Sequence, residues 1–229
     1  PEPVLVADIL CTVDGVRAFH ARGVGIRLVP DWPLTHWRRL GPPAAQTSGA
    51  AVPHRELAGL QGHRESAAVA EVDGFRYDYA AMLACAWGRP SEAFGPAYAS
   101  FDSSRKLARL PGPPFHFMSR VVGVEGTPWV MEAGAAVEVE YEVPEDVWYF
   151  EQSDFTGAMP FSVLMEVVLQ ASGWLASYVG SALTSDSDLL FRNLDGTGTV
   201  HREVRPGMGV LRTRTTLREV SRSTEMIIQ

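Results

Sequence analysis

The chain has 229 residues, with 20 basic and 27 acidic side chains and a formal net charge of −7 at pH 7. Hydrophobic residues make up 46% of the sequence and aromatic residues 10%, which excludes a disordered polar chain. Acid exceeds base, so the composition gives no support to a nucleic-acid-binding protein. The length predicts one or two globular domains.

Two cysteines, Cys11 and Cys85, stand in apolar stretches and not in a CxxC or CxH pair. Two cysteines make no disulfide framework in a chain of this length, and neither has the neighbours of a zinc ligand. We therefore expect buried free thiols, no metal site and a reducing, cytoplasmic compartment. The chain begins with Pro-Glu-Pro and not with Met, and it shows no signal-peptide pattern, which indicates a piece excised from a longer protein.

The first predicted element is a strand hairpin over residues 4–29, because two β-rich apolar runs flank a Val-Asp-Gly turn at 13–15. Prolines and glycines then interrupt residues 30–70, which is typical of a linker. Residues 76–87 carry alanines and spaced apolar side chains that favour a short helix, and Gly88 ends it.

Strands are predicted from Phe115 onward. Residues 115–124 form the first candidate and residues 129–143 the second. Within the second, residues 136–143 alternate apolar and acidic side chains, so one face of this strand is expected to be wet and the other packed. Pro144 ends this strand.

A long helix is predicted over residues 160–179, between Pro160 in its first turn and Gly180 at its end. It is apolar nearly all round, so we expect it to be buried on every side rather than to span a membrane. Glu166 and Gln170 lie four residues apart on one face. Burial raises the pKa of an unpartnered carboxyl toward that of a general acid. The alternative is a glutamate at the helix edge that points to solvent or bonds to a neighbour.

After the helix, strand-like runs are predicted at residues 189–194, 197–204, 210–220 and 226–229. The order is therefore strands, one long apolar helix and then further antiparallel strands. This order predicts the α+β class, with a sheet that wraps one helix.

Several separated motifs carry a resemblance to a known family. The central-helix region, with Trp148-Tyr149-Phe150, Met159-Pro160, Glu166 and Gln170, resembles that of FabA-like hotdog dehydratases. The resemblance is closest to the dehydratase region of polyunsaturated fatty acid synthases and related iterative polyketide synthases. It rests on RLVPDWPL (27–34), ARLPGPPFHFMSRV (108–121), MPFSVLMEVVLQASGWLASYVGSALTS (159–185) and DLLFRNLDGTGTVHREV (188–204).

The resemblance implies a hotdog fold, an antiparallel sheet around one long central helix, as part of a tandem or double hotdog. It implies lipid metabolism, in which a lyase removes water from a 3-hydroxyacyl thioester. A histidine takes the α-proton, and a carboxylic acid on the partner hotdog's central helix protonates the leaving hydroxyl. A backbone N–H at a helix N-terminus polarises the thioester carbonyl. The implied partners are an acyl carrier protein with a phosphopantetheine-linked acyl chain and an adjacent hotdog or a homodimer; no cofactor is implied.

The family's site residues match this chain in part. Glu166 falls at the acidic position, and Gln170 matches the glutamine that follows it. Met159 and Pro160 match the start of the helix, but Phe161 stands where the family usually has glycine. Glycine there lets the acyl thioester approach the backbone, so Phe161 alters the expected substrate-binding surface.

The proton-abstracting histidine is missing from its expected place, which Gln152 occupies. Glutamine is no base at neutral pH, so we interpret the chain as a pseudo-dehydratase hotdog. It either lends Glu166 to a composite site whose histidine lies in an adjacent hotdog, or it is purely structural. Asp154 is an alternative base if the alignment shifts by two residues, whereas His116 is expected to pack in its strand.

The predicted organisation has three parts. We expect residues 1–29 to be the closing strands of a preceding hotdog and residues 30–109 to be a linker with short helices. Residues 110–229 are expected to form a hotdog, with or without its C-terminal strands. A second account lets the N-terminal hairpin fold back and close the same sheet. Two other functions stay open. One is a hotdog acyl thioesterase with Glu166 as nucleophile or base, and the other is a non-catalytic acyl-binding or dimerisation scaffold.

Carrier proteins are acidic, so a docking patch should be basic. Arg105, Lys106 and Arg109 form one candidate patch, and Arg202 with Arg205 forms another. A solvated charge cluster is the alternative interpretation of both.

Overall fold

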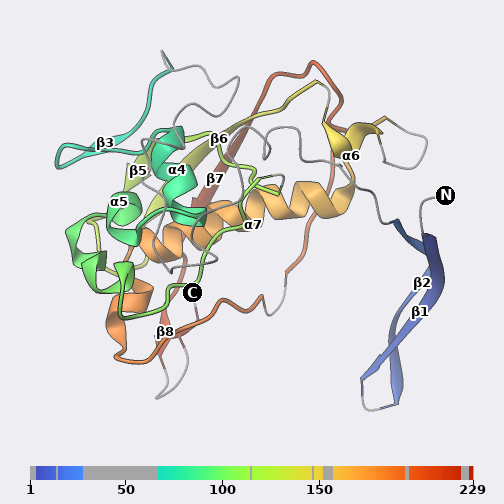
Figure 1. Ribbon diagram of the computed structural model, residues 1–229, viewed down its shortest axis with the longest axis horizontal. Coiled ribbons are helices and arrows are strands. Elements are labelled where there is room, and N and C mark those ends of the chain that lie inside the picture. The colour runs from blue at the N-terminus through green and yellow to red at the C-terminus, as the bar shows by residue number, and fades with distance from the viewer. Residues whose placement is uncertain are drawn as a thin grey trace. The chain divides into compact units, whose positions relative to one another are not determined.

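The computed structural model describes residues 4–13, 15–27, 67–113, 115–145, 147–151, 157–193, 196–222 and 227–228 (Figure 1). The chain divides into two compact units, Pro1–Arg39 and Leu40–Gln229. No helix in these described ranges is long and apolar enough to cross a membrane.

The smaller unit confirms the predicted hairpin. Strands β1 (Val4–Val13) and β2 (Val16–Arg27) pair antiparallel, with Gly15 at the turn in the left-handed region at a φ of 78°. The register shifts twice along the ribbon. At the first shift, the N–H of Gly23 donates to Asp8 Oδ1 at 2.8 Å, so the extra residues lie in β2 and β1 continues as a regular strand.

The larger unit is built on an antiparallel sheet of strand order β5-β6-β7. β5 is Arg120–Glu125, β6 is Ala136–Glu142 and β7 is Val210–Thr216. The alternation predicted for residues 136–143 is confirmed, because the apolar side chains of β6 are buried and the acidic ones lie on the other face. β5, β6 and β7 are each shorter than the strand predicted there. A short pair, β8 (Ser221–Arg222) and β9 (Ile227–Ile228), follows.

Arginines neutralise the acidic face of β6. Glu140 lies between Arg120 at 2.7 Å and Arg212 at 2.6 Å, one from each neighbouring strand, and Arg120 also meets Glu142 at 2.6 Å. Desolvation lowers the pKa of the Arg120 guanidinium, but its hydrogen bonds to Glu142 and Glu140 outweigh this and raise it overall. The pairing therefore fixes the order of the three strands by charge as well as by backbone hydrogen bonds.

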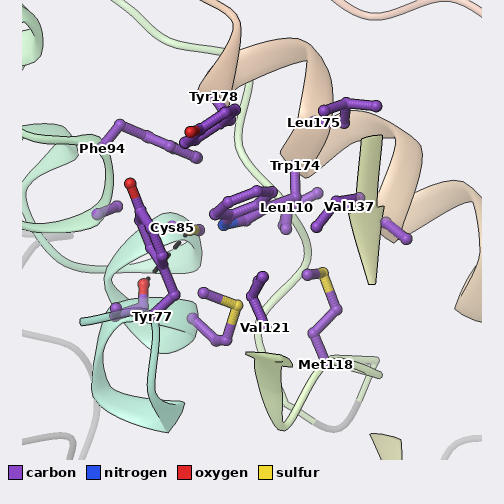
Figure 2. Close-up of a cluster of buried hydrophobic side chains, with 14 of the residues drawn as sticks. Tyr77, Cys85, Phe94, Leu110, Met118, Val121, Val137, Trp174, Leu175 and Tyr178 are labelled. Carbon is purple, nitrogen blue, oxygen red and sulfur yellow. Dashed lines mark hydrogen bonds between the residues drawn. The ribbon is translucent and has the colours of Figure 1, made fainter. Parts of the chain in front are cut away.

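The helices that precede the sheet belong to its core. α4 (Tyr79–Ala86), α5 (Pro90–Phe94) and the 3₁₀ helix η1 (Pro96–Asp102) lie within the predicted linker of residues 30–109. The helix expected over 76–87 is confirmed as α4. Figure 2 shows Cys85 of α4 and Phe94 of α5 in the core beside the central helix. Phe94 and Tyr77, which precedes α4, both lie close to the Trp174 ring. The described part of this segment, residues 67–109, therefore contributes side chains to the core.

Both cysteines are free thiols, as expected. Cys85 is buried in this core, and burial raises the pKa of its thiol to about 12. Its S–H donates to the Ala81 carbonyl at 3.3 Å. Cys11 is only half-buried.

The long helix is confirmed as α7 (Phe161–Tyr178), and it lies across the sheet (Figure 1). Gly180 ends it in the left-handed conformation, at a φ of 80°. The expectation of burial on every side is wrong for its first half. Phe161 and Val168 are 55% and 41% exposed, whereas Trp174 is fully buried. β6 and β7 are the strands in contact with α7, and within the described residues they leave part of its first half exposed.

The strands predicted at 189–194 and 197–204 are wrong. The described residues between the 3₁₀ helix η2 (Ser181–Thr184) and β7 have no regular structure and are almost all exposed. The segment runs back along α7. A Cβ at Gly173 would lie 3.5 Å from the Phe191 ring, and one at Gly198 would lie 3.5 Å from the sulfur of Met165. It packs on a helix and not beside a strand, so its β-type sequence has no ladder to join.

Candidate functional site

Met159 and Pro160 set the start of α7. The N–H of Met159 donates to the Val204 carbonyl at 2.7 Å, and the Met159 side chain is buried. The Pro160 carbonyl accepts two N–H groups of the first turn, each at 3.0 Å, without any side-chain cap. Phe161 follows and is 55% exposed, so its ring stands out from the helix start where the resemblance expects a bare backbone.

Gln170 joins the middle of α7 to the extended segment before β5. The side chain is 1% exposed. Its Oε1 accepts from the N–H of Phe117 at 2.8 Å, and its Nε2 donates to the Phe115 carbonyl at 2.6 Å. A rotated amide would set oxygen against carbonyl and N–H against N–H, so the backbone of this segment dictates the orientation of Gln170.

Glu166 lies one turn before Gln170 and is half-buried. The second hydrogen of the Gln170 Nε2 points to Glu166 Oε1 at 3.1 Å. Since Oε1 is the acceptor of this bond, a proton on the carboxyl sits on Oε2. Oε2 has no hydrogen-bond partner among the described residues. The arrangement therefore orients one oxygen of the carboxyl and, within the described residues, leaves the other without a partner.

The described residues nearest to Glu166 on α7 carry no charge. Ser162, Met165 and Leu169 lie within one turn of it on the uncovered side of α7, and all three are exposed or half-buried. A single carboxyl on a mainly apolar surface fits a ligand that is mostly hydrocarbon with one polar group beside it.

Phe115 and Phe117 are the site residues that sequence reasoning missed. Their side chains predicted a strand, but their backbone groups hold Gln170. Their rings also build an aromatic wall. Phe115 lies 5.0 Å from the ring of Trp148, in the short helix α6 (Trp148–Glu151), and Phe117 lies 5.5 Å from Tyr141. The stretch at 108–121 already belonged to the resemblance, and this was the one signal that could have pointed to it.

Two tyrosine hydroxyls bond to each other behind these aromatic rings. Tyr141 and Tyr149 are buried, and their hydroxyl oxygens lie 3.0 Å apart. Burial raises the pKa of both phenols, that of Tyr149 to about 12, so both stay protonated at neutral pH. They satisfy each other and fix the aromatic packing.

His116 is buried, as expected. Its contacts within the described residues are with Pro111 and Tyr79 and not with Glu166. Its Nδ1 lies 2.9 Å from the Pro111 carbonyl, and its ring is 6.2 Å from that of Tyr79. Its Nε2 is buried without a hydrogen-bond partner of good geometry among the described residues. Burial lowers the pKa of His116 to about 4, against the opposing effect of the backbone at Pro111 and Met118, so the imidazole is neutral.

Gln152 and Asp154, the two residues considered for the base position, lie outside the described residues. Of the six site residues predicted from the sequence, the structure therefore places five. Met159, Pro160, Phe161, Glu166 and Gln170 all stand on α7 or at its start. No group of three His, Cys, Asp or Glu side chains in the described ranges could hold a metal ion.

Part of the first basic patch has a structural task. The Arg105 guanidinium donates to the carbonyls of Ser185 and Ser187 at 2.8 and 2.9 Å, and it stacks 4.2 Å over Phe101. Arg109 donates to the Gly88 carbonyl at 2.6 Å, behind the end of α4. These two arginines anchor loops, which disfavours them as a docking patch.

One curated protein with sequence similarity is a polyunsaturated fatty acid synthase subunit from Thraustochytrium sp., 34% identical over 116 residues. The chain is similar to a region of this synthase subunit. The alignment covers 47% of this chain and 8% of the Thraustochytrium protein, so the chain corresponds to a small part of a much longer protein. No protein-family model matches.

Proposed function

We propose that residues 110–229 form a dehydratase-like hotdog of a fatty acid or polyketide synthase. The support is a long helix, α7, lying across an antiparallel sheet, together with the similarity to a polyunsaturated fatty acid synthase. Residues 1–29 are then closing strands of a hotdog, and the helices within 30–109 extend the core. The substrate is a 3-hydroxyacyl chain on the phosphopantetheine of an acyl carrier protein.

Glu166 is the acid in this proposal. A base removes the α-proton of the thioester, the C–O bond at C3 breaks, and the hydroxyl leaves as water with the proton from Glu166 Oε2. A double bond forms between C2 and C3. Glu166 is left as a carboxylate, which the donor hydrogen of Gln170 stabilises, and solvent reprotonates it. The observation that carries this role is the fully buried Gln170 amide, which is oriented by Phe115 and Phe117 and aimed at Glu166.

The base belongs to an adjacent hotdog. Gln152 stands at the position expected for histidine, and His116 is buried against Pro111 and Tyr79. Base chemistry therefore requires a second hotdog, either from the same synthase or from a homodimer partner, whose histidine meets the uncovered face of α7. In this composite site, Glu166 supplies the acid and the second hotdog supplies the histidine that acts as the base.

The test is dehydration of a 3-hydroxyacyl thioester by the parent synthase carrying Glu166→Gln. Loss of the acid should reduce the rate at least about 100-fold. Glu71→Gln, at an exposed glutamate of the hairpin β3 (Glu71–Val72) and β4 (Phe75–Arg76), is the matched control and should keep the wild-type rate. An unchanged rate in the Glu166 variant would leave this hotdog with a structural role.

A thioesterase is the second candidate, because an open carboxyl with no histidine beside it can act as the base or nucleophile of hydrolysis. Hydrolysis of acyl thioesters by the isolated 229-residue chain, abolished by Glu166→Gln, would support it. Dehydration by the parent without hydrolysis by the isolated chain would reject it.

A further inference from the structure

Gly173 is a glycine in the interior of α7, where glycine is less favourable than alanine. A Cβ at this position would lie 3.2 Å from Leu110 Cδ2 and 3.5 Å from the ring of Phe191. The first distance is tighter than an ordinary van der Waals contact, so a side chain here would displace Leu110. The glycine therefore allows two segments of the chain, one before β5 and one after α7, to meet on the helix.

Gly173 lies on the face of α7 that carries Glu166. The two residues are seven positions apart, which is close to two full turns, so they lie on the same side of the helix. Leu169 lies between them, and all three residues are partly exposed. The rise per residue places Gly173 roughly 10 Å from Glu166 along the helix axis. Leu110 and Phe191 therefore limit this face at a defined distance from the carboxyl.

The position of Phe191 is set by the anchor of its segment. The Arg105 guanidinium donates to the Ser185 carbonyl at 2.8 Å, and the N–H of Lys106 donates to Asp188 Oδ1 at 3.0 Å. Phe191 follows these contacts by three residues, and its ring lies at Gly173 with 37% of its surface exposed. The ring is therefore held against the helix by its segment as well as by its own contact.

The two ends of this face differ. Beyond Gly173, every residue from Trp174 to Gly180 is buried, so the face ends in the core. At the start of the helix, Phe161 and Ser162 are exposed. A carrier-bound substrate needs solvent access at its thioester, whereas the end of its hydrocarbon tail gains most from apolar neighbours. The tail is therefore expected to point from Glu166 toward Gly173.

The side chains along this path suit a hydrocarbon. Leu169 lies on the helix between the carboxyl and the end of the face, where Leu110 and Phe191 meet. Phe115, whose carbonyl accepts the Gln170 amide, adds a ring that is 49% exposed. A chain of fitting length is covered by these apolar groups, whereas a longer one collides with the side chains at the end of the face.

We propose that Leu110 and Phe191, which meet at Gly173, form an acyl stop that limits the length of the substrate's hydrocarbon chain. The inference rests on the proposed function, since it places C3 of the acyl chain at Glu166. A distance of roughly 10 Å accommodates about eight carbon–carbon bonds of an extended chain. Acyl chains of up to about ten carbons therefore fit, and longer ones must displace Phe191 or leave the helix.

The test compares dehydration of two 3-hydroxyacyl pantetheine thioesters by the parent synthase, one with ten carbons and one with sixteen. Only the part of the rate that Glu166→Gln abolishes is counted, so that other sites of the synthase do not contribute. The unsubstituted protein should favour the ten-carbon substrate in kcat/KM at least about tenfold, because a packed pocket discriminates even single methylene groups.

Two variants should move this preference in opposite directions. Phe191→Ala removes half of the acyl stop and should raise kcat/KM for the sixteen-carbon substrate at least about tenfold. Leu169→Trp adds bulk between Glu166 and the acyl stop, and should lower kcat/KM for the ten-carbon substrate while a four-carbon one keeps its rate. Leu190→Ala is the matched control, because Leu190 lies on the same segment with 68% of its surface exposed, and it should leave the preference unchanged.

The results separate this inference from the reaction on which it rests. An unchanged preference in Phe191→Ala, with turnover still lost in Glu166→Gln, would overturn the acyl stop and leave the proposed reaction in place. Equal kcat/KM for the two substrates in the unsubstituted protein would do the same. Turnover that survives Glu166→Gln would reject the proposed function, and the acyl stop with it.

Discussion

The two halves of α7 are both mainly apolar but have very different surroundings. From Trp174 to Val179 every residue is buried, and the Trp174 ring stacks on Tyr178 at 5.2 Å. From Phe161 to Val168 the helix alternates between buried and open side chains, and Glu166 stands on its open part. An apolar helix is therefore not buried by its sequence alone, since what covers it comes from other elements. The second half ends wholly within the core, whereas the first half is buried on one side and exposed on the other.

The largest expected effect is in the buried half. Trp174→Ala removes a fully buried ring that also contacts Tyr77 at 5.0 Å. The substitution should lower the free energy of unfolding by about 4 kcal/mol, through lost burial and the cavity left behind. Urea denaturation of the chain measures it. A loss below about 1 kcal/mol would mean that the second half of α7 is not the centre of the core.

Acid should destabilise the folded chain through His116, which is buried in the extended segment before β5. The pKa of His116 is about 4 in the folded state and 6.5 for an unperturbed histidine, so the unfolded chain binds the proton first. Stability is therefore complete above about pH 6.5 and falls as the pH drops from about 6.5 to about 4, by about 3 kcal/mol. Urea titrations at several pH values measure this slope, and His116→Gln should flatten it. An equal slope in that variant would contradict the assignment.

Gln170 stands at the boundary of the halves. Gln170→Leu keeps the volume but leaves the N–H of Phe117 and the carbonyl of Phe115 without their partner. We expect a loss of about 2 kcal/mol in the free energy of unfolding. Ser172→Ala is the control, because the Ser172 hydroxyl bonds only within its own helix, to the Val168 carbonyl. If both variants were equally stable, Gln170 would not anchor α7 to the extended segment before β5.

The smallest expected effect is on the open surface. Val168→Ser changes an apolar side chain that is 41% exposed, and it should alter the free energy of unfolding of the monomer by less than about 1 kcal/mol. A loss comparable to that of Trp174→Ala would show that the first half is covered as tightly as the second, and the contrast between the halves would disappear.

The sequence predicted those features that depend on neighbours along the chain. Pro160 and Gly180 bound the helix where expected, the period-2 pattern of β6 identified its faces, and the spacing of four placed Glu166 beside Gln170. Features that depend on distant partners were not predicted. The backbone of Phe115 and Phe117 holds Gln170 across more than 50 residues, and the β-rich segment after α7 packs on a helix for lack of a strand.

Under the proposed function, Glu166 serves the reaction and contributes little to stability. The decisive measurement pairs two readouts on Glu166→Gln: dehydration of a 3-hydroxyacyl thioester by the parent synthase, and the free energy of unfolding of the 229-residue chain. We predict a rate at least about 100-fold lower with unfolding within about 1 kcal/mol of the unsubstituted chain. A wild-type rate with any change in stability would contradict the claim.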